Sequence, residues 1–365
     1  MPLKSVHYSN LNALRCIAVF IVIIHHIEAY KNMFSIGSNC HIAIINMGKL
    51  GVVLFFVLSG FLITNLLLIE QKSEENINIV NFYKRRILRI WPLYFFIVTI
   101  SLFLLPHLLW VPEYDLNEIN SHIAIKSILF IFLLPNLVNS LFGALHYTGH
   151  LWSIGVEEQF YLIWPISMKF IKNKTLFIGI LSALYIMIKY LLIHSNFFVI
   201  TKYWLETPID CLAIGGLFSL INMKYTSISK IIFKKYIQYP VFIGTTIFMF
   251  LGIDFGFLQY EVYAIMFGII ISNLALNAKR IMNLEKIKSL NYLGKISYGI
   301  YMYHPMVIVF VIDIMLKFQH SNSIIIYTLS FILTIGISAL SYHFIESKFL
   351  KLKTRFSTII TGGNN

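Results

Sequence analysis

Charged residues are scarce in this sequence, and the shortage decides its class. They make up 12% of the 365 residues, whereas 58% are hydrophobic; a soluble domain carries roughly 25% charged residues. So small a polar share cannot cover a surface that faces water, and the mean hydropathy of +0.76 agrees. Apolar runs of roughly 20 residues, the length that spans a bilayer, recur along the chain. We therefore expect an all-α, polytopic integral membrane protein.

Cysteine is scarce as well. Cys16, Cys40 and Cys211 show neither paired nor metal-ligand spacing. Two of them lie in apolar runs, where cysteine is usually a small packing residue. We expect no disulfide framework, and no His or carboxylate set has the spacing of a metal site.

A cleavable signal peptide is also lacking. The first apolar run, 11–29, has no small-residue cleavage site and carries charged or titratable residues, namely Arg15, His25, His26 and Glu28. This run is therefore predicted to be the first membrane helix. Because no linker or low-complexity tract interrupts the chain, we expect one transmembrane domain over 1–365 with no appended soluble domain.

Acidic residues number 16 against 29 Lys and Arg, for a net charge of +13. Such an excess can indicate nucleic-acid binding. Here the basic residues gather in short loops between apolar runs, as the positive-inside rule expects of a membrane protein. The expected partner is a lipid bilayer and not a nucleic acid.

Eleven segments are apolar enough to form membrane helices: 11–29, 50–69, 92–109, 123–140, 154–171, 175–193, 208–222, 239–253, 257–275, 296–316 and 324–345. The loops 70–89, 223–238 and 276–295 and the tail are basic, which places them in the cytoplasm. The loop 110–122 carries only acidic charge (Glu113, Asp115 and Glu118), which places it outside. Both chain ends are then cytoplasmic, and the number of crossings is even.

The region 122–172 conflicts with that orientation. Lys172 and Lys174 favour the cytoplasm, yet two full crossings before them would place them outside. We therefore expect about ten crossings, with one of 123–140 and 154–171 re-entrant or interfacial. Polar structure at membrane depth is tolerated where it lines a cavity.

Ionisable residues inside membrane helices are costly, so each is a functional candidate. Arg15 and His26 are eleven positions apart, which brings them within about 20° of each other around a helix and roughly 16 Å apart along it. His25 points about 80° away. The alternative is that Arg15 anchors the helix at the interface and His26 only packs.

The basic run 82–92 includes Arg86 and Arg89, which project from one side of a helical turn. Two guanidinium groups so placed suit phosphates, such as those of a cytosolic nucleotide-bearing donor. The alternative is a positive-inside stop signal, which explains the charge but not the interleaved aromatic residues and Pro92.

Two further polar stretches lie in apolar surroundings. The stretch 150–161 contains His150, Trp152, Ser153 and the adjacent carboxylates Glu157 and Glu158, and its alternative interpretation is an interfacial acidic turn. The stretch 297–305 contains Tyr298 and His304, and an aromatic interface belt accounts for it nearly as well as function does.

A series of motifs carries a resemblance to a known family. They are Arg15 with ten residues before His26, Phe55 through Ile63, Phe82 through Tyr94, Leu151 through Tyr161, Asp210 before Gly215-Gly216, Ser297-Tyr298 through His304-Pro305, and Ser341-Tyr342 to Glu346. In this order they resemble the membrane acyltransferase-3 family over about 12–346, nearly the whole chain. The sequence departs from the family pattern at Val53, Pro208 and Lys348, where Asp, Arg and Pro are usual. The departure at Pro208 puts the role of the nearby Asp210 in doubt.

The resemblance implies a bacterial inner-membrane O-acyltransferase, foremost an O-acetyltransferase. Its acceptor would be a surface glycan or the lipid-linked precursor of one, such as O-antigen, capsule or exopolysaccharide. Its donor would be cytosolic acyl-CoA, used as a substrate, with no permanently bound cofactor. Some relatives carry an extra esterase-like domain, which we do not expect here. The oligomeric state and the acceptor sugar stay open.

The same resemblance implies roles for single residues. Arg86 and Arg89, helped by Arg15, would hold the phosphates of CoA. His26 would act as general base on the sugar hydroxyl or would itself take the acyl group, and both routes stay open. Glu157 would orient His26, and Trp152 would shape the acyl pocket. The supporting residues would be Ser153, Glu158, His150, Tyr298, His304 and Asp210.

A secondary transporter of an anion or sugar is the alternative function, since composition and topology fit it equally well. A transporter needs no phosphate-holding arginine pair beside a buried histidine. Internal inverted repeats would favour transport, and the sequence shows none.

Overall fold

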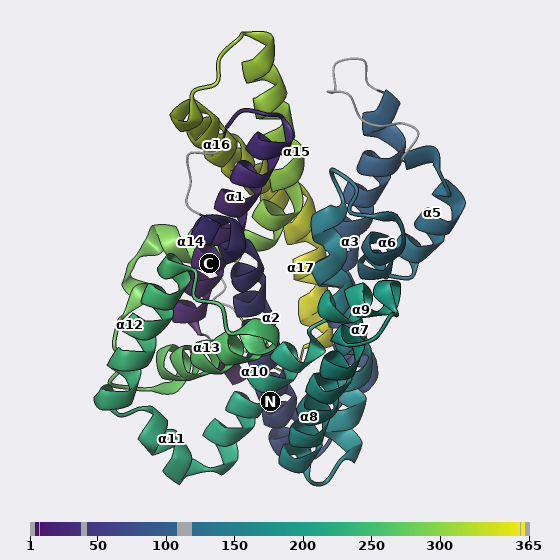
Figure 1. Cartoon of the computed structure of the whole chain (residues 1–365). Coiled ribbons are helices and arrows are strands. Elements are labelled where there is room, and N and C mark those ends of the chain that lie inside the picture. Colours follow the sequence, from purple (N-terminus) through teal and green to yellow (C-terminus); the bar gives the residue numbers. More distant parts are fainter. Residues whose placement is uncertain (1–3, 7, 38–41, 108–118, 358, 362–365) are drawn as a thin grey trace.

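The computed structural model describes residues 4–6, 8–37, 42–107, 119–357 and 359–361. Cys40 and the acidic residues Glu113, Asp115 and Glu118 lie outside this part of the chain. Helices dominate, as the sequence predicts, and Figure 1 shows them arranged as a bundle. One pair of three-residue strands is the exception among the described residues.

The α-helices follow from the N-terminus in this order: α1 (Ser9–Met33), α2 (Ile42–Ser73), α3 (Ile79–Thr99), α5 (Ile123–Ile131), α6 (Pro135–Phe142), α7 (Trp152–Phe170), α8 (Lys174–Ile193), α9 (Phe198–Leu205), α10 (Ile209–Lys224), α11 (Thr226–Ile232), α12 (Lys235–Leu251), α13 (Gln259–Leu276), α14 (Lys288–Lys295), α15 (Ser297–Lys317), α16 (Ser323–Ser341) and α17 (Ser347–Lys353). Short 3-10 segments are η2 (Leu105–His107), η3 (Gly149–Leu151), η4 (Gly256–Leu258), η5 (Leu284–Lys286) and η7 (Thr354–Phe356). Two π-helical segments, η1 (Ile100–Leu104) and η6 (Tyr342–Glu346), continue α3 and α16.

Eight helical segments of the described chain are long and apolar enough to cross a membrane. About ten were expected. α7 is 19 residues long but carries the charges of Glu157, Glu158 and Lys169, and α12 is 17 residues long. At about 1.5 Å per residue both approach the thickness of the hydrocarbon layer. The chain is therefore a polytopic helical membrane protein, and these two helices account for the difference from the expected number.

The first and the last described segments of the chain lie side by side. β1 (Lys4–Val6) pairs in parallel with β2 (Ile359–Thr361). Both ends of the described chain are therefore on the same side of the bundle, which agrees with the even number of crossings expected from the charge distribution.

The prediction that residues 70–89 form one loop is wrong. α2 runs to Ser73 and α3 begins at Ile79, so the basic run lies on a helix. The side chain of Asn78 caps the start of α3 by accepting a hydrogen bond from the backbone N–H of Asn81, at 3.0 Å. An apolar window misses this start because the first turns of α3 are amphipathic and not apolar.

The segment 123–140 does not form one helix. It breaks between α5 and α6, where Leu133 has a left-handed backbone conformation (φ 60°) and Pro135 begins the next helix. Neither piece exceeds 9 residues, which is too short to span a bilayer. Of the two segments in the conflicting region, 123–140 is thus the broken one and α7 is continuous.

Glycines bring the central helices into close contact. A Cβ on Gly60 in α2 would collide with the carbonyl oxygen of Leu212 in α10, and a Cβ on Gly215 in α10 would collide with that of Val57 in α2. Small residues at such crossings let helix backbones approach closely in a membrane. The indole N–H of Trp164 in α7 adds a hydrogen bond to the hydroxyl of Thr64 in α2, at 2.8 Å.

This contact predicts a stability difference between two matched substitutions. Gly60→Ala should destabilise the protein by about 1–3 kcal/mol, because the new methyl group meets backbone that cannot move aside. Gly179→Ala, on α8 with nothing within 4 Å of its Cβ position, should be neutral or stabilise by up to about 1 kcal/mol. Thermal unfolding of the two variants in the same detergent measures the difference, and equal melting temperatures would contradict the packing.

Candidate functional site

Two clusters of polar side chains lie at different levels of α1. Arg15 belongs to one and His26 to the other, and the helix is continuous between them. Eleven residues at about 1.5 Å each separate the two levels by roughly 16 Å. The sequence predicted this separation, and the structure adds the residues that each cluster draws from other helices.

The histidine cluster consists of His26, His150 and His304. The ring centroids of His26 and His304 lie 4.8 Å apart, and those of His150 and His304 lie 5.2 Å apart. The three rings come from α1, η3 and α15, and His150 and His304 are buried. Residues more than a hundred positions apart in the sequence thus form one site.

Backbone carbonyl groups fix the tautomers of two of these rings. Nδ1 of His26 lies 2.9 Å from the carbonyl oxygen of Val22, and Nδ1 of His304 lies 2.6 Å from that of Tyr301. A carbonyl oxygen can only accept, so each Nδ1 carries the proton. Nε2 of neutral His26 therefore keeps its lone pair, which is the form that a general base or a nucleophile needs.

Tyr301 connects the expected supporting residues. Its hydroxyl donates to the carbonyl oxygen of His150 at 2.8 Å and lies 2.7 Å from the hydroxyl of Ser153. Trp152 packs edge-to-face on Phe56, with centroids 5.9 Å apart. Sequence reasoning missed Tyr301, although it lies one helical turn before His304.

His25 packs differently from the three clustered histidines, although its ring is in contact with that of His26. A Cβ on Gly48 of α2 would collide with the His25 ring, so this ring packs against the neighbouring helix. Helical periodicity in the sequence also predicted that His25 and His26 lie on different faces of this helix. His25 is therefore a packing residue between α1 and α2, with its ring edge-to-face on His26 at 4.9 Å.

The arginine cluster consists of Arg15, Arg86 and Arg89. Arg15 interacts electrostatically with both other arginines and with Glu157 and Tyr161 of α7. The guanidinium of Arg86 lies over the ring of Tyr161, 5.5 Å from its centroid, which is the geometry of a cation–π contact. Within the part of the chain that the structure describes, none of the three arginines forms an ion pair.

The expected contact between Glu157 and His26 is absent from the structure, which corrects the orienting role given to Glu157. Its carboxylate accepts hydrogen bonds from the hydroxyls of Ser59 at 2.8 Å and Tyr161 at 2.7 Å. The carboxylate belongs to the arginine cluster because α7 carries it about two turns away from His150. Ser59 lies in the Phe55–Ile63 motif, which was the signal that could have identified it.

Glu158 and Tyr298 join α7 and α15 to α3 instead of touching the histidines. The indole N–H of Trp91 donates to Glu158 at 3.0 Å, and the Tyr298 hydroxyl donates to the carbonyl oxygen of Ile90 at 2.8 Å. These bonds fix the helix that carries Arg86 and Arg89 relative to the two helices that carry the other site residues.

Asp210 belongs to a separate group. It is buried in α10, and its electrostatic partners include Glu261 of α13 and Lys189 of α8. Lys189 and Glu261 form a buried ion pair of 2.7 Å. The structure thus does not bring Asp210 to the histidine cluster.

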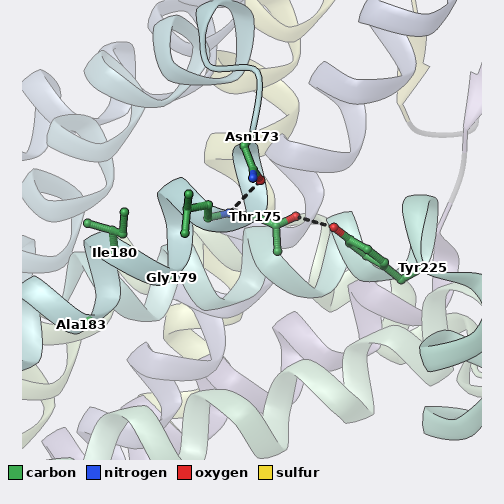
Figure 2. A pocket seen from close by; sticks show the side chains of 7 residues that line it. Asn173, Thr175, Gly179, Ile180, Ala183 and Tyr225 are labelled. Carbon is green, nitrogen blue, oxygen red and sulfur yellow. Dashed lines mark hydrogen bonds between the residues drawn. The ribbon is translucent and has the colours of Figure 1, made fainter.

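A surface hollow of about 490 Å³ lies apart from both clusters. It is lined by residues of the first half of α8, together with Asn173 and Tyr225, and Figure 2 shows the hydrogen bond between the Thr175 and Tyr225 hydroxyls (3.3 Å) at its edge. Its lining contains no charged side chain and no histidine. It lacks the groups for acyl transfer.

Comparison with known proteins decides the family. Residues 8–343 match the family model described as an acyltransferase domain, Acyl_transf_3. The chain belongs to the acyltransferase-3 family. This membership confirms the resemblance seen in the motifs, and it favours an enzyme over the transporter alternative.

Several curated proteins resemble this acyltransferase-3 chain. It is 28% identical to "O-acetyltransferase OatA" of Staphylococcus aureus over 364 residues, covering 94% of this chain and 57% of the relative. It is 28% identical to "Peptidoglycan O-acetyltransferase OatA" of Listeria monocytogenes (94% and 56%) and to "Putative peptidoglycan O-acetyltransferase YrhL" of Bacillus subtilis (92% and 54%). The chain spans about half the length of these relatives. No solved structure matches it.

The histidine cluster generates a prediction that separates two adjacent residues. His26→Ala should lower acyl transfer by roughly 10²–10⁴-fold, because it removes the base, whereas His25→Ala should keep its activity and lose stability at most. Ester formation should be measured at equal amounts of membrane-inserted protein, since misfolding would resemble a catalytic defect. A fully active His26→Ala protein would contradict the role of His26, and an inactive His25→Ala protein together with an active His26→Ala protein would show that the wrong ring was chosen.

Proposed function

We propose that this protein transfers an acetyl group from cytosolic acetyl-CoA to a hydroxyl of a cell-surface glycan outside the bacterial cytoplasmic (inner) membrane. The observation that carries the proposal is the arrangement along α1. Arg15 of α1 and the two arginines of α3, which have no carboxylate partners among the described residues, lie at one level along α1. His26, whose Nε2 keeps its lone pair, lies roughly 16 Å further along the same helix. A donor with phosphates at one end and a thioester at the other fits this arrangement.

The arginine cluster is the donor end of the proposed site. Guanidinium groups bind phosphates through paired N–H donors, and Arg86 and Arg89 stand one turn apart on α3. The basic residues on and around α3 favour a cytoplasmic position for this end, where acyl-CoA is made. In this proposed orientation both ends of the described chain are cytoplasmic, because the β1–β2 pair keeps them on one side.

His26 is the reacting residue of the proposed mechanism. Its Nε2 takes the proton of the sugar hydroxyl while the oxygen attacks the thioester carbonyl carbon. The C–S bond breaks as the ester C–O bond forms, and the leaving thiolate takes up the proton. In the second route Nε2 attacks the thioester carbonyl carbon and expels the thiolate of coenzyme A. The sugar hydroxyl oxygen then attacks the acyl carbon, the C–N bond to Nε2 breaks as the ester C–O bond forms, and the hydroxyl proton goes to the thiolate. Both routes use the same nitrogen, whose lone pair the bond from Nδ1–H to Val22 leaves free.

The support for a glycan acceptor comes from the relatives. All three names specify an O-acetyltransferase, and those of the Listeria and Bacillus proteins specify peptidoglycan. The chain is 28% identical to these relatives and spans about half their length. Peptidoglycan is therefore the first acceptor to test, ahead of O-antigen, capsule or exopolysaccharide. Acetyl-CoA enters the proposal as a substrate, and the mechanism uses no resident cofactor.

The donor assignment predicts the kinetics of one arginine variant. Arg86→Ala should raise the KM for acetyl-CoA by on the order of tenfold or more, because a charge-assisted contact contributes about 1.5–3 kcal/mol. Arg86→Lys should restore affinity only in part, since an ammonium lacks the planar fork. Initial rates in inverted membrane vesicles, with donor and acceptor varied in turn, measure both KM values.

Arg280→Ala is the matched control for this prediction. Arg280 is a basic residue of a different loop, 3.8 Å from the carboxylate of Glu285, and its loss should leave both KM values unchanged. If Arg86→Ala raised the KM for the glycan and not that for acetyl-CoA, the donor end would be assigned to the wrong substrate.

A further inference from the structure

The C-terminal helix α17 lies along α3 (Figure 1), and both α17 and the segment η7 contact this helix, which carries Arg86 and Arg89. Two contacts bind them there. The guanidinium of Arg85 donates to the carbonyl oxygen of Phe356 at 2.8 Å, and the ammonium of Lys84 lies 4.9 Å from the centroid of the Phe356 ring. The C-terminal segment is therefore docked on the turn of α3 that also carries Arg86.

The lysines of α17 differ in their surroundings. Lys348 and Lys351 are exposed, whereas Lys353 is half-buried. Lys353 interacts electrostatically with all three members of the arginine cluster, Arg15, Arg86 and Arg89, and also with the neighbouring Arg85. Of the lysines on this helix, Lys353 is the one that faces into the cluster.

Four cations thus converge from three helices, and nearby carboxylates do not pair with them. Glu157 accepts its hydrogen bonds from Ser59 and Tyr161, and Glu346 accepts one from the hydroxyl of Ser341 at 3.5 Å. Among the described residues, Arg15, Arg86, Arg89 and Lys353 form no ion pair.

The neighbouring Arg85 differs from these four cations because it has a carboxylate partner. It is paired with the carboxylate of Glu70 at 3.0 Å, in addition to its bond to Phe356. Like charges held together at half-buried positions repel each other and lose part of their hydration, so the arrangement is stabilised when an anion binds between them. An anion with several phosphate charges matches four cations better than a single carboxylate does.

We propose that Lys353 completes the phosphate site, so that the phosphates of the donor are held between α1, α3 and α17. The inference rests on the proposed function, because it takes coenzyme A as the anion. It adds a binding residue from the opposite end of the chain and gives the docking of Phe356 on α3 a role, which is to hold Lys353 in the site. A lipid phosphate has similar chemistry, so the test must distinguish a bound lipid from the donor.

The test measures binding of coenzyme A to the full chain in nanodiscs of zwitterionic lipid. Lys353→Met keeps the apolar stem and removes the charge; it should raise the Kd by about tenfold or more, as expected for the loss of one charge-assisted contact. Lys353→Arg should keep most of the affinity. The matched control Lys351→Met removes an equal charge from the exposed face of the same helix and should change the Kd less than twofold. Equal melting temperatures for the two Met variants establish that folding is unchanged.

A second probe, 3′-dephospho-coenzyme A, identifies the phosphate. If Lys353→Met weakens both probes equally, Lys353 binds the diphosphate; if it weakens coenzyme A alone, Lys353 binds the 3′-phosphate. Both results support the proposal.

Arg86→Ala separates failure of this inference from failure of the proposed function. If Arg86→Ala weakens binding of coenzyme A while Lys353→Met matches Lys351→Met, the inference is wrong and Lys353 does not bind the donor. If Arg86→Ala also leaves binding unchanged, coenzyme A does not occupy this cluster and the donor assignment itself is wrong.

Discussion

A charge held inside a membrane protein must be matched by a partner, and this requirement organises the polar groups of the bundle. Lys189 pairs with Glu261, and Arg85 pairs with Glu70. Each of these pairs joins different helices and is complete within the protein. The arginine cluster is not complete within the protein in this sense, because its members form no ion pair among the described residues. Because an unpaired, half-buried cation loses part of its hydration without a compensating charge, the cluster is where an anionic substrate contributes most.

The helix α1 connects this charge requirement to chemistry. Arg15 and His26 lie on one continuous helix, so their separation is fixed by helical geometry and not by loops that could move. The other helices supply what α1 lacks: α3 brings two more arginines, and α15 brings His304 to 4.8 Å from His26. A substrate that spans both clusters would therefore meet a rigid frame, which favours reaction by holding the reacting groups in place.

Hydropathy and residue spacing predicted most of the membrane helices and the two levels of α1, because both depend on local periodicity. The start of α3 was missed because it rests on the Asn78 cap and an amphipathic turn. The break at Leu133 was missed because a left-handed residue leaves no mark in hydropathy. The contact between Glu157 and Ser59 could not be predicted either, although a motif contains Ser59, because the contact forms only through packing of α2 against α7. The sequence patterns thus predicted which residues belong to the site better than they predicted which residues contact each other there.

The most direct test of the account is transfer across a sealed bilayer. The protein would be reconstituted into liposomes that enclose acetyl-CoA with a labelled acetyl group, with a soluble peptidoglycan fragment added outside. For molecules whose arginine cluster faces the lumen, the account predicts that labelled ester appears on the external glycan while coenzyme A stays inside. Ester formation only when donor and acceptor share one compartment would contradict the claim that α1 joins a donor site on one side of the membrane to a reacting histidine that serves the other.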